Sequence, residues 1–488
     1  MKLKLWLCQT LLLATISCAS WADNRAGGTS LEVGQDQDET GESCLLDEDF
    51  ESPTSQSCGI YTDAMGNNPL ITTRYSADPT ARIFDDILYL YPSTDIDGEE
   101  EISFNGFCMP GYYAYSTENL MDWKDWGKLF GQEDVEWAIQ DKYCMWAPDC
   151  VKYGDKYYYY FPTLAQVGDF KIGVAISDAP EGPFVLESNF IEGISNIDPN
   201  VFIDDDGKAY ITTGGGHINF KMAELDPSMT KIVGEAFELL GPEYVEGDYK
   251  EAPFIFKRGD IYYLTYPYSL SGGGSNLHYA VSDNVKGPYT PKGQFLGSVN
   301  CWTSHHSIVE YNGEWILFYH SNQISGEDKR RSVCADYISF SDDGDIIPVT
   351  QTLRGVGAVP AWREIQIDRS SFASGVTVEK ISADFPANWI LKSLSSSSVI
   401  RYDRVDFSSQ EYTKINIRCN ATTAGGIVTI KDYSTDEVIA KVEIPSTDGE
   451  WRTYQTTISG SVPSAATNLM VRFSDGMGDT QIDWIRFL

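Results

Sequence analysis

The chain has 488 residues and a formal net charge of −35, from 71 acidic and 36 basic side chains. This charge argues against binding to nucleic acid or anionic membranes, because both need basic surfaces. The length exceeds one compact domain, and 29 Tyr, 22 Phe, 12 Trp and 42 Gly indicate an all-β protein rich in turns.

The first 22 residues have the features of a secretory signal peptide. Lys2 and Lys4 precede an apolar run, and Ser20-Trp21-Ala22 supplies small residues for cleavage. The apolar run is shorter than the roughly 20 residues that span a bilayer. We therefore expect an exported protein, periplasmic or extracellular, with no membrane span. A lipoprotein modified at Cys18 is the alternative.

Residues 23–57 are polar and acidic and predict a flexible leader. An oxidising compartment permits disulfides, and no cysteine spacing in the chain matches a zinc motif. Cys44 and Cys58 are the predicted disulfide pair, and two free thiols are the alternative.

A sequence pattern recurs five times between residues 58 and 358. In each copy a proline or serine opens an apolar run that passes through a turn into an aromatic-rich strand. The spacings of 69, 51, 54 and 54 residues match the period of a four-stranded propeller blade. We therefore predict a five-bladed β-propeller over residues 58–358. The five anchors are Pro79, Pro148, Pro199, Pro253 and Ser307.

Beyond Pro360 the tyrosine clusters disappear, and short segments of alternating apolar and polar residues follow, such as 414–418 and 426–430. This alternation is typical of antiparallel strands with one buried face. We predict a second domain, a jelly-roll-like β-sandwich, over residues 375–488.

Ionisable and aromatic residues precede the first strand of each predicted blade. Because these strands line the propeller axis, the residues at their entrances should converge on one pit. They are Asp78, Trp146, Asp198, Glu251 and His305.

Three carboxylates in one pit suit glycoside hydrolysis, which needs an acid to protonate the leaving oxygen and a base to activate water. We predict Asp78 as the base and Glu251 as the acid. Asp198 would raise the pKa of Glu251 through its negative charge. Taken singly, each acid also fits an ordinary strand-entry turn.

Aromatic residues complete the predicted pocket. Trp146 could stack on a sugar ring, and the loops that carry Phe107 and Trp302 should decide which sugar fits. His305 could orient a carboxylate, a water or a cation. Packed core residues are the alternative for Trp146 and His305.

A resemblance to a known family supports these assignments. Asp78-Pro79, Trp146-Ala147-Pro148-Asp149, Asp198-Pro199, Glu251-Ala252-Pro253 and His305-His306-Ser307 together resemble the signature set of glycoside hydrolase family 43. The resemblance covers about residues 60–360 and implies a five-bladed propeller, inversion at the anomeric carbon and the three carboxylate roles.

The same resemblance implies further details of the site. It places a calcium or sodium ion near His305, held through water, and it implies a substrate-contacting arginine at Arg331. It implies no cofactor for the chemistry.

The terminal domain resembles carbohydrate-binding module family 6 through Asp448-Gly449-Glu450-Trp451 and Ile482-Asp483-Trp484. This resemblance implies an accessory sugar platform at Trp451. The family's asparagine near the final tryptophan is matched here by Gln481.

The predicted function is a secreted, inverting glycoside hydrolase that releases xylose or arabinose from hemicellulose such as xylan or arabinoxylan. The motifs do not separate a β-xylosidase from an α-L-arabinofuranosidase. An endo-acting, arabinanase-type enzyme of the same fold and a non-catalytic carbohydrate-binding propeller are the alternatives. The oligomeric state is left open.

Overall fold

The computed structural model describes residues 60–62, 66–98, 100–215, 220–239, 251–269, 275–381, 386–423 and 425–488. The predicted signal peptide with Cys18, the leader 23–57 and the predicted Cys44–Cys58 pair lie outside these residues. Within the described ranges, no helix has the length and apolar character to cross a membrane.

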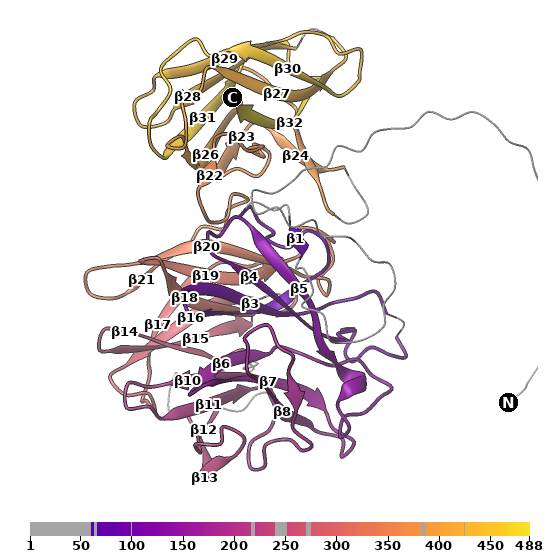
Figure 1. Cartoon of the computed structure of the whole chain (residues 1–488), viewed down its shortest axis with the longest axis vertical. Helices are drawn as coiled ribbons and strands as arrows, with labels where there is room; N and C mark the ends of the chain where they lie inside the picture. The colour runs from indigo at the N-terminus through magenta and orange to yellow at the C-terminus, as the bar shows by residue number, and fades with distance from the viewer. Residues whose placement is uncertain are drawn as a thin grey trace, which may run out of the picture. The chain divides into compact units, whose positions relative to one another are not determined.

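The described residues form an all-β protein, as predicted, with a single turn of 3-10 helix, η1 (Gln132–Asp134), and no α-helix. Five antiparallel sheets follow one another along the chain, and Figure 1 shows them in colours running from indigo to salmon. The short strand β1 (Ile60–Thr62) pairs with the outer strand of the first sheet. From inner to outer strand, the sheets are β2 (Ala77–Phe84), β3 (Ile87–Ser93), β4 (Gly111–Thr117) and β5 (Trp123–Gly131); β6 (Asp149–Tyr153), β7 (Lys156–Leu164), β8 (Phe170–Ser177) and β9 (Val185–Leu186); β10 (Ile197–Ile203), β11 (Ala209–Gly214), β12 (Lys221–Leu225) and β13 (Ile232–Glu238); β14 (Phe254–Arg258), β15 (Ile261–Ser269), β16 (Ser275–Ser282) and β17 (Thr290–Leu296); and β18 (His306–Tyr311), β19 (Glu314–Ser321), β20 (Ser332–Phe340) and β21 (Ile346–Ile347).

The first strands of the five sheets lie next to one another in a closed ring. β2 contacts β6, β6 contacts β10, β10 contacts β14, β14 contacts β18, and β18 returns to β2. The backbone N–H of Ala81 donates to Ser307 Oγ at 2.9 Å across that last contact. The segment before β2 also bonds to β20, where Leu70 N–H donates to Val333 O at 2.8 Å. The described chain therefore joins its first and last sheets.

The tyrosine-rich second strands are buried on both faces because each sheet packs between two neighbours. In β7, Tyr157 and Tyr159 pack with Tyr112 of the first sheet. Tyr158 and Tyr160 alternate with them and pack with residues of the third sheet such as Val201 and Ile211. Side chains alternate between the two faces of a strand, so consecutive tyrosines fill two different intersheet cores.

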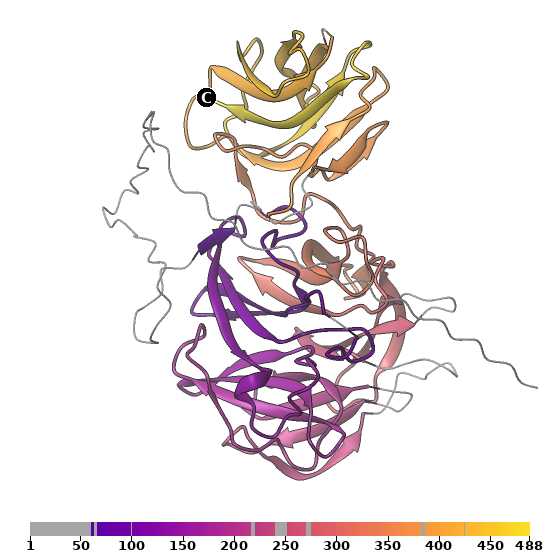
Figure 2. The same cartoon turned by 90° about the vertical axis from the view of Figure 1, so that its right-hand side faces the viewer.

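The strands after residue 358 form a β-sandwich, as predicted, and they appear in orange and yellow in Figure 2. In β27, apolar residues alternate with polar ones, and the apolar residues, such as Ile415 and Ile417, face the core. Two short strands before residue 375, β22 and β23, pair with β26. One sheet contains β22 (Val359–Pro360), β23 (Phe372–Ser374), β26 (Val399–Asp406), β31 (Thr467–Phe473), β28 (Gly426–Asp432) and β29 (Val438–Ile444), and the other contains β24 (Thr377–Lys380), β25 (Trp389–Lys392), β32 (Thr480–Phe487), β27 (Lys414–Ala421) and β30 (Arg452–Thr457).

Candidate active site

A cavity of about 280 Å³ gathers eight of the nine residues that the sequence singled out. They come from all five sheets and the loops that join them, so the fold brings together side chains that lie up to 253 residues apart in the chain. The eight are Asp78, Phe107, Trp146, Asp198, Glu251, Trp302, His305 and Arg331. Further lining residues include Asn105, Met109, Ser269, Thr303 and Ser304.

Backbone irregularities direct two of the acids into this cavity. The pairing of β2 with β3 is irregular between Ala77 and Thr80, and that of β10 with β11 is irregular between Ile197 and Asn200. Within these irregularities Asp78 has φ 47° and Asp198 has φ 55°, which are left-handed values. Such conformations are uncommon outside glycine and re-aim a side chain relative to a regular strand.

This geometry explains a mismatch in the repeats. Asp78 and Asp198 stand one residue before their prolines, whereas Glu251 stands two residues before Pro253. In the fourth sheet the residue with the left-handed φ, 46°, is Ala252, which leaves Glu251 to line the cavity. The period of the repeats predicts the convergence of these residues but not the local backbone turn.

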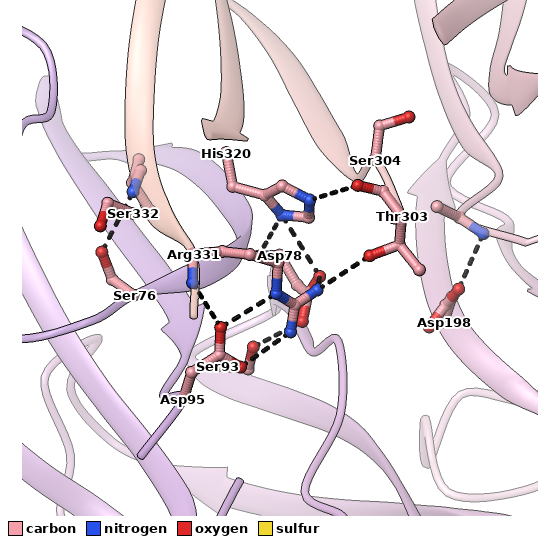
Figure 3. A network of polar contacts seen from close by, with 12 residues as sticks. Ser76, Asp78, Ser93, Asp95, Asp198, Thr303, Ser304, His320, Arg331 and Ser332 are labelled. Carbon is pink, nitrogen blue, oxygen red and sulfur yellow. Dashed lines mark hydrogen bonds and ion pairs between the residues drawn. The ribbon is translucent and has the colours of Figure 1, made fainter. Parts of the chain in front are cut away.

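Polar groups surround the carboxylate of Asp78 (Figure 3). Ser93 Oγ donates to Oδ2 at 2.6 Å, and Arg331 Nη1 donates to Oδ1 at 2.7 Å. Burial alone would raise the pKa of Asp78, but Arg331 and the other surrounding polar side chains outweigh it and hold this pKa below its usual range. Asp78 is therefore ionised at neutral pH, as a base must be.

His320 supports the strained backbone of Asp78. The backbone N–H of Asp78 donates to His320 Nδ1 at 3.1 Å, so this nitrogen carries no proton. The other ring nitrogen, Nε2, donates to Thr303 O at 3.0 Å. Burial lowers the pKa of His320 to about 3, which fits a neutral imidazole.

Arg331 is buried, and its five side-chain N–H groups all donate within the protein. Two reach Asp95, at 2.9 Å each, and one reaches Asp78. The remaining two point to Thr303 Oγ1 at 3.2 Å and to Met109 Sδ at 3.7 Å. The structure thus gives Arg331 a direct contact with the predicted base, and its contact with substrate stays a prediction.

Asp198 and Glu251 have the opposite electrostatic environment to Asp78. Burial and the negative charge of Asp78 raise the pKa of Asp198, although the backbone N–H of Ala252 donates to its Oδ2 at 2.8 Å. Burial, followed by the charges of Asp198 and Asp78, raises the pKa of Glu251 well above its usual range. Glu251 therefore retains a proton at a pH where Asp78 is ionised.

His305 lines the cavity, and burial lowers its pKa to about 4, so its imidazole is neutral and able to coordinate a cation. However, no group of three or more His, Cys, Asp and Glu side chains among the described residues is arranged to hold a metal ion. Among the described residues, His305 would therefore hold an ion only with the help of other ligands such as water.

Aromatic rings form one side of the cavity. Trp146 packs on Phe170 with ring centroids 4.6 Å apart, and Phe107 stacks on Trp302 at 5.8 Å. Trp302 is 48% exposed, so this wall continues to the surface. The cavity therefore combines a carboxylate cluster with apolar faces suited to sugar rings.

Trp451 is the one predicted site residue outside this cavity. It lies in the sandwich just before β30, is partly exposed, and has the Arg418 guanidinium 5.6 Å from its ring centroid.

The sequence did not predict a role for Ser93, Asp95 and His320, which act on the site through contacts with Asp78 or Arg331. These residues come from the second strands or the loops after them, which the repeat anchors do not mark.

Comparison with known proteins agrees with both resemblances seen in the sequence. Residues 66–346 match the family model described as Glycosyl hydrolases family 43, and residues 369–488 match Carbohydrate binding module (family 6). The chain belongs to glycosyl hydrolases family 43. Enzymes of this family need no cofactor for their chemistry.

Two relatives and one solved structure each match between 50% and 58% of this family 43 chain. The xylosidase/arabinosidase 43A of Humicola insolens is 36% identical over 329 residues, which are 57% of this chain and 98% of that protein. The beta-xylosidase of Xylanibacter ruminicola is 37% identical over 285 residues, or 50% and 87% of the two chains. A crystal structure of a beta-xylosidase/alpha-arabinofuranosidase from a compost microbial metagenome, in complex with xylotriose and in a calcium-free form, has 34% identity and a TM-score of 0.54. It covers 58% of this chain and 97% of its own.

Proposed function

We propose that this family 43 protein is an inverting glycoside hydrolase that releases xylose or arabinose units from hemicellulose such as xylan or arabinoxylan. The observation that carries the proposal is one cavity that holds Asp78 and Glu251 in opposite surroundings. Arg331 and Ser93 donate to Asp78 and favour its ionised form, whereas burial raises the pKa of Glu251. The names of the relatives, xylosidases and arabinosidases, support pentose as the released sugar.

Each carboxyl group has one role in the proposed reaction. Asp78 accepts a proton from a water molecule as the water oxygen bonds to the anomeric carbon. Glu251 donates its proton to the glycosidic oxygen as the bond to the leaving group breaks. The sugar leaves with inverted configuration, Asp78 is then protonated and Glu251 ionised, and proton exchange with solvent restores the starting state.

The surrounding residues assist these two groups. Asp198 keeps Glu251 protonated through its nearby charge, and Trp146, Phe107 and Trp302 offer apolar faces to the sugar rings. We also propose that Arg331 contacts the substrate. An ion near His305 would be held through water. Trp451 would provide the accessory sugar platform on the sandwich.

We also propose a five-bladed architecture and an exported location for this protein. The ring of inner strands supports a five-bladed propeller over residues 58–358, followed by the jelly-roll-like sandwich over 375–488. The N-terminal signal pattern supports export after cleavage behind Ala22, with a leader over residues 23–57.

Hydrolysis of an aryl β-xyloside and an aryl α-L-arabinofuranoside tests this function, with NMR used to identify the first anomer released. We expect turnover of at least one substrate with inversion, and loss of turnover in Asp78→Asn, which keeps the size of the side chain but removes the base. Retention of configuration, or no turnover of pentosides and their oligomers by the folded protein, would contradict the proposal.

A further inference from the structure

Asp95 is a buried carboxylate that holds Arg331 without lining the cavity. It lies just after β3 and is 2% exposed. Its Oδ2 accepts from the backbone N–H of Arg331 at 2.7 Å and from Nε at 2.9 Å, and its Oδ1 accepts from Nη2 at 2.9 Å. Three hydrogen bonds thus tie one carboxylate to one arginine. Two-oxygen contacts of this kind fix the plane of a guanidinium as well as its position.

These three hydrogen bonds with Asp95 fix the direction in which the other end of the Arg331 guanidinium points. With Nε and Nη2 held by Asp95, Nη1 faces Oδ1 of Asp78 at 2.7 Å (Figure 3). Oδ2 of Asp78 accepts from Ser93, two residues before Asp95. One segment, the end of β3 and the loop after it, therefore holds the base directly through Ser93 and indirectly through Arg331.

The negative charge of Asp95 also weakens the stabilisation that Arg331 gives to ionised Asp78. One positive charge, that of Arg331, lies between two buried carboxylates, Asp78 and Asp95. If Asp95 were neutral, the whole positive charge would stabilise ionised Asp78, and a more stable carboxylate is a weaker base. Among the described residues, the other titratable groups whose charges interact with Asp78 are His320 from β19, His305 before β18, Asp198 in β10, Glu251 before β14 and Tyr112 in β4.

We propose that Asp95 is a positioning residue for the reaction, which fixes Arg331 so that Asp78 stays aligned with the attacking water and basic enough to take its proton. This inference rests on the proposed function, because it concerns the same base. Asp95 itself touches neither the cavity nor the reacting atoms.

Asp95→Asn tests the proposal, because the amide keeps the size of the side chain but places an NH₂ group against an N–H of Arg331. On the better of the two aryl pentosides, we expect kcat to fall about 100-fold, the scale of loss for a misplacement of about 1 Å. KM should change little, because Asp95 does not line the cavity and so makes no contact with substrate. The acidic limb of the kcat profile should move to lower pH, because the ionised form of Asp78 gains stability.

Asp97→Asn is the matched control. Asp97 lies two residues further along the chain, pairs with Arg330 at 2.5 Å, and its side chain is 75% exposed. We expect wild-type kcat and an unchanged pH profile. Asp95→Glu is the second variant, which keeps the charge but displaces the carboxylate by one methylene. We expect kcat to fall, while the acidic limb of its pH profile stays at the wild-type pH.

Wild-type kcat in Asp95→Asn, or an acidic limb that does not move, would overturn the proposal. An equal loss in Asp97→Asn would overturn it too. If Asp95→Asn does not fold, Asp95→Glu decides, because wild-type kcat in that variant contradicts a positioning role. Failure of the proposed function is a different result, since the wild-type protein would then turn over no pentoside.

Discussion

Asp198 and Glu251 show how one residue sets the protonation state of another. Burial raises the pKa of both, and the charge of Asp198 adds to the increase at Glu251. In the proposed reaction Glu251 must be protonated, so we expect activity to be lost as the pH rises through its raised pKa.

Asp198→Asn should therefore move the basic limb of the pH profile to lower pH. Removing the negative charge makes ionised Glu251 less costly, which lowers its pKa. The measurement is kcat/KM against pH on an aryl pentoside. Asp205→Asn, at an exposed carboxylate that pairs with Lys257, is the control and should leave the limb in place. A basic limb that stays fixed or moves upward in Asp198→Asn would remove Asp198 from this role.

Among the strands, sequence periodicity predicts those whose pattern is local and repeated along the chain. The recurring anchors lie at the start of β2, β6, β10, β14 and β18 or just before it. Alternation predicts the sandwich strand β27 in the same way, because one of its faces is buried.

The remaining features arise between elements, which explains why the sequence alone does not show them. The left-handed backbone of Asp78 depends on an irregular pairing with β3 and on an acceptor, His320, from the last sheet. Asp95 finds its partner 236 residues away. No local pattern marks either contact, because each partner lies in a different sheet.

One buried amide, that of Asn68, contributes to the closure of the ring. Its Nδ2 donates to Ala335 O and to Thr352 O at 2.9 Å, and its Oδ1 accepts from Ala335 N–H at 2.7 Å. The side chain thus joins the segment before β2 to β20 and to the chain after β21.

Asn68→Ala should lower the free energy of unfolding by about 3 kcal/mol, because it leaves several buried backbone groups without partners. Denaturant unfolding of the two proteins measures the difference. Asn189→Ala, at an exposed asparagine, is the control, with an expected change within about 0.5 kcal/mol. Equal stability of Asn68→Ala and wild type would show that this amide does not hold the ring together.

For the whole molecule, buried ionisable groups make stability depend on pH. Burial raises the pKa of Asp336 and of Asp368 to about 7, and it raises those of Asp198 and Glu251 as well. Above an unfolded pKa near 4 the folded protein then binds more protons than the unfolded chain, so its stability falls with rising pH up to the raised pKa values. The buried His305 and His320, with pKa values lowered to about 4 and about 3, act in the opposite sense below pH 6.5.

Below pH 6.5 the buried acids and the buried histidines have opposite effects on stability. Of these groups, only the acids change stability above pH 6.5. We therefore expect a lower Tm at about pH 8 than at pH 6.5 in calorimetry at constant ionic strength. Asp336→Asn should reduce this difference, since it removes one of the titrating acids. A Tm that is equal or higher at the more alkaline pH would contradict this assignment of buried protonated acids.

In the proposed reaction, Glu251 supplies the proton that the leaving group needs. Glu251→Gln should lose most of its rate on xylo-oligosaccharides, whose alkoxide leaving groups require protonation. It should lose far less on an aryl pentoside with an acidic phenol, which leaves without that proton. The measurement is the ratio of kcat/KM between wild type and Glu251→Gln on both substrates. We expect a much larger ratio for the oligosaccharide, whereas equal ratios would show that Glu251 does not act as the acid.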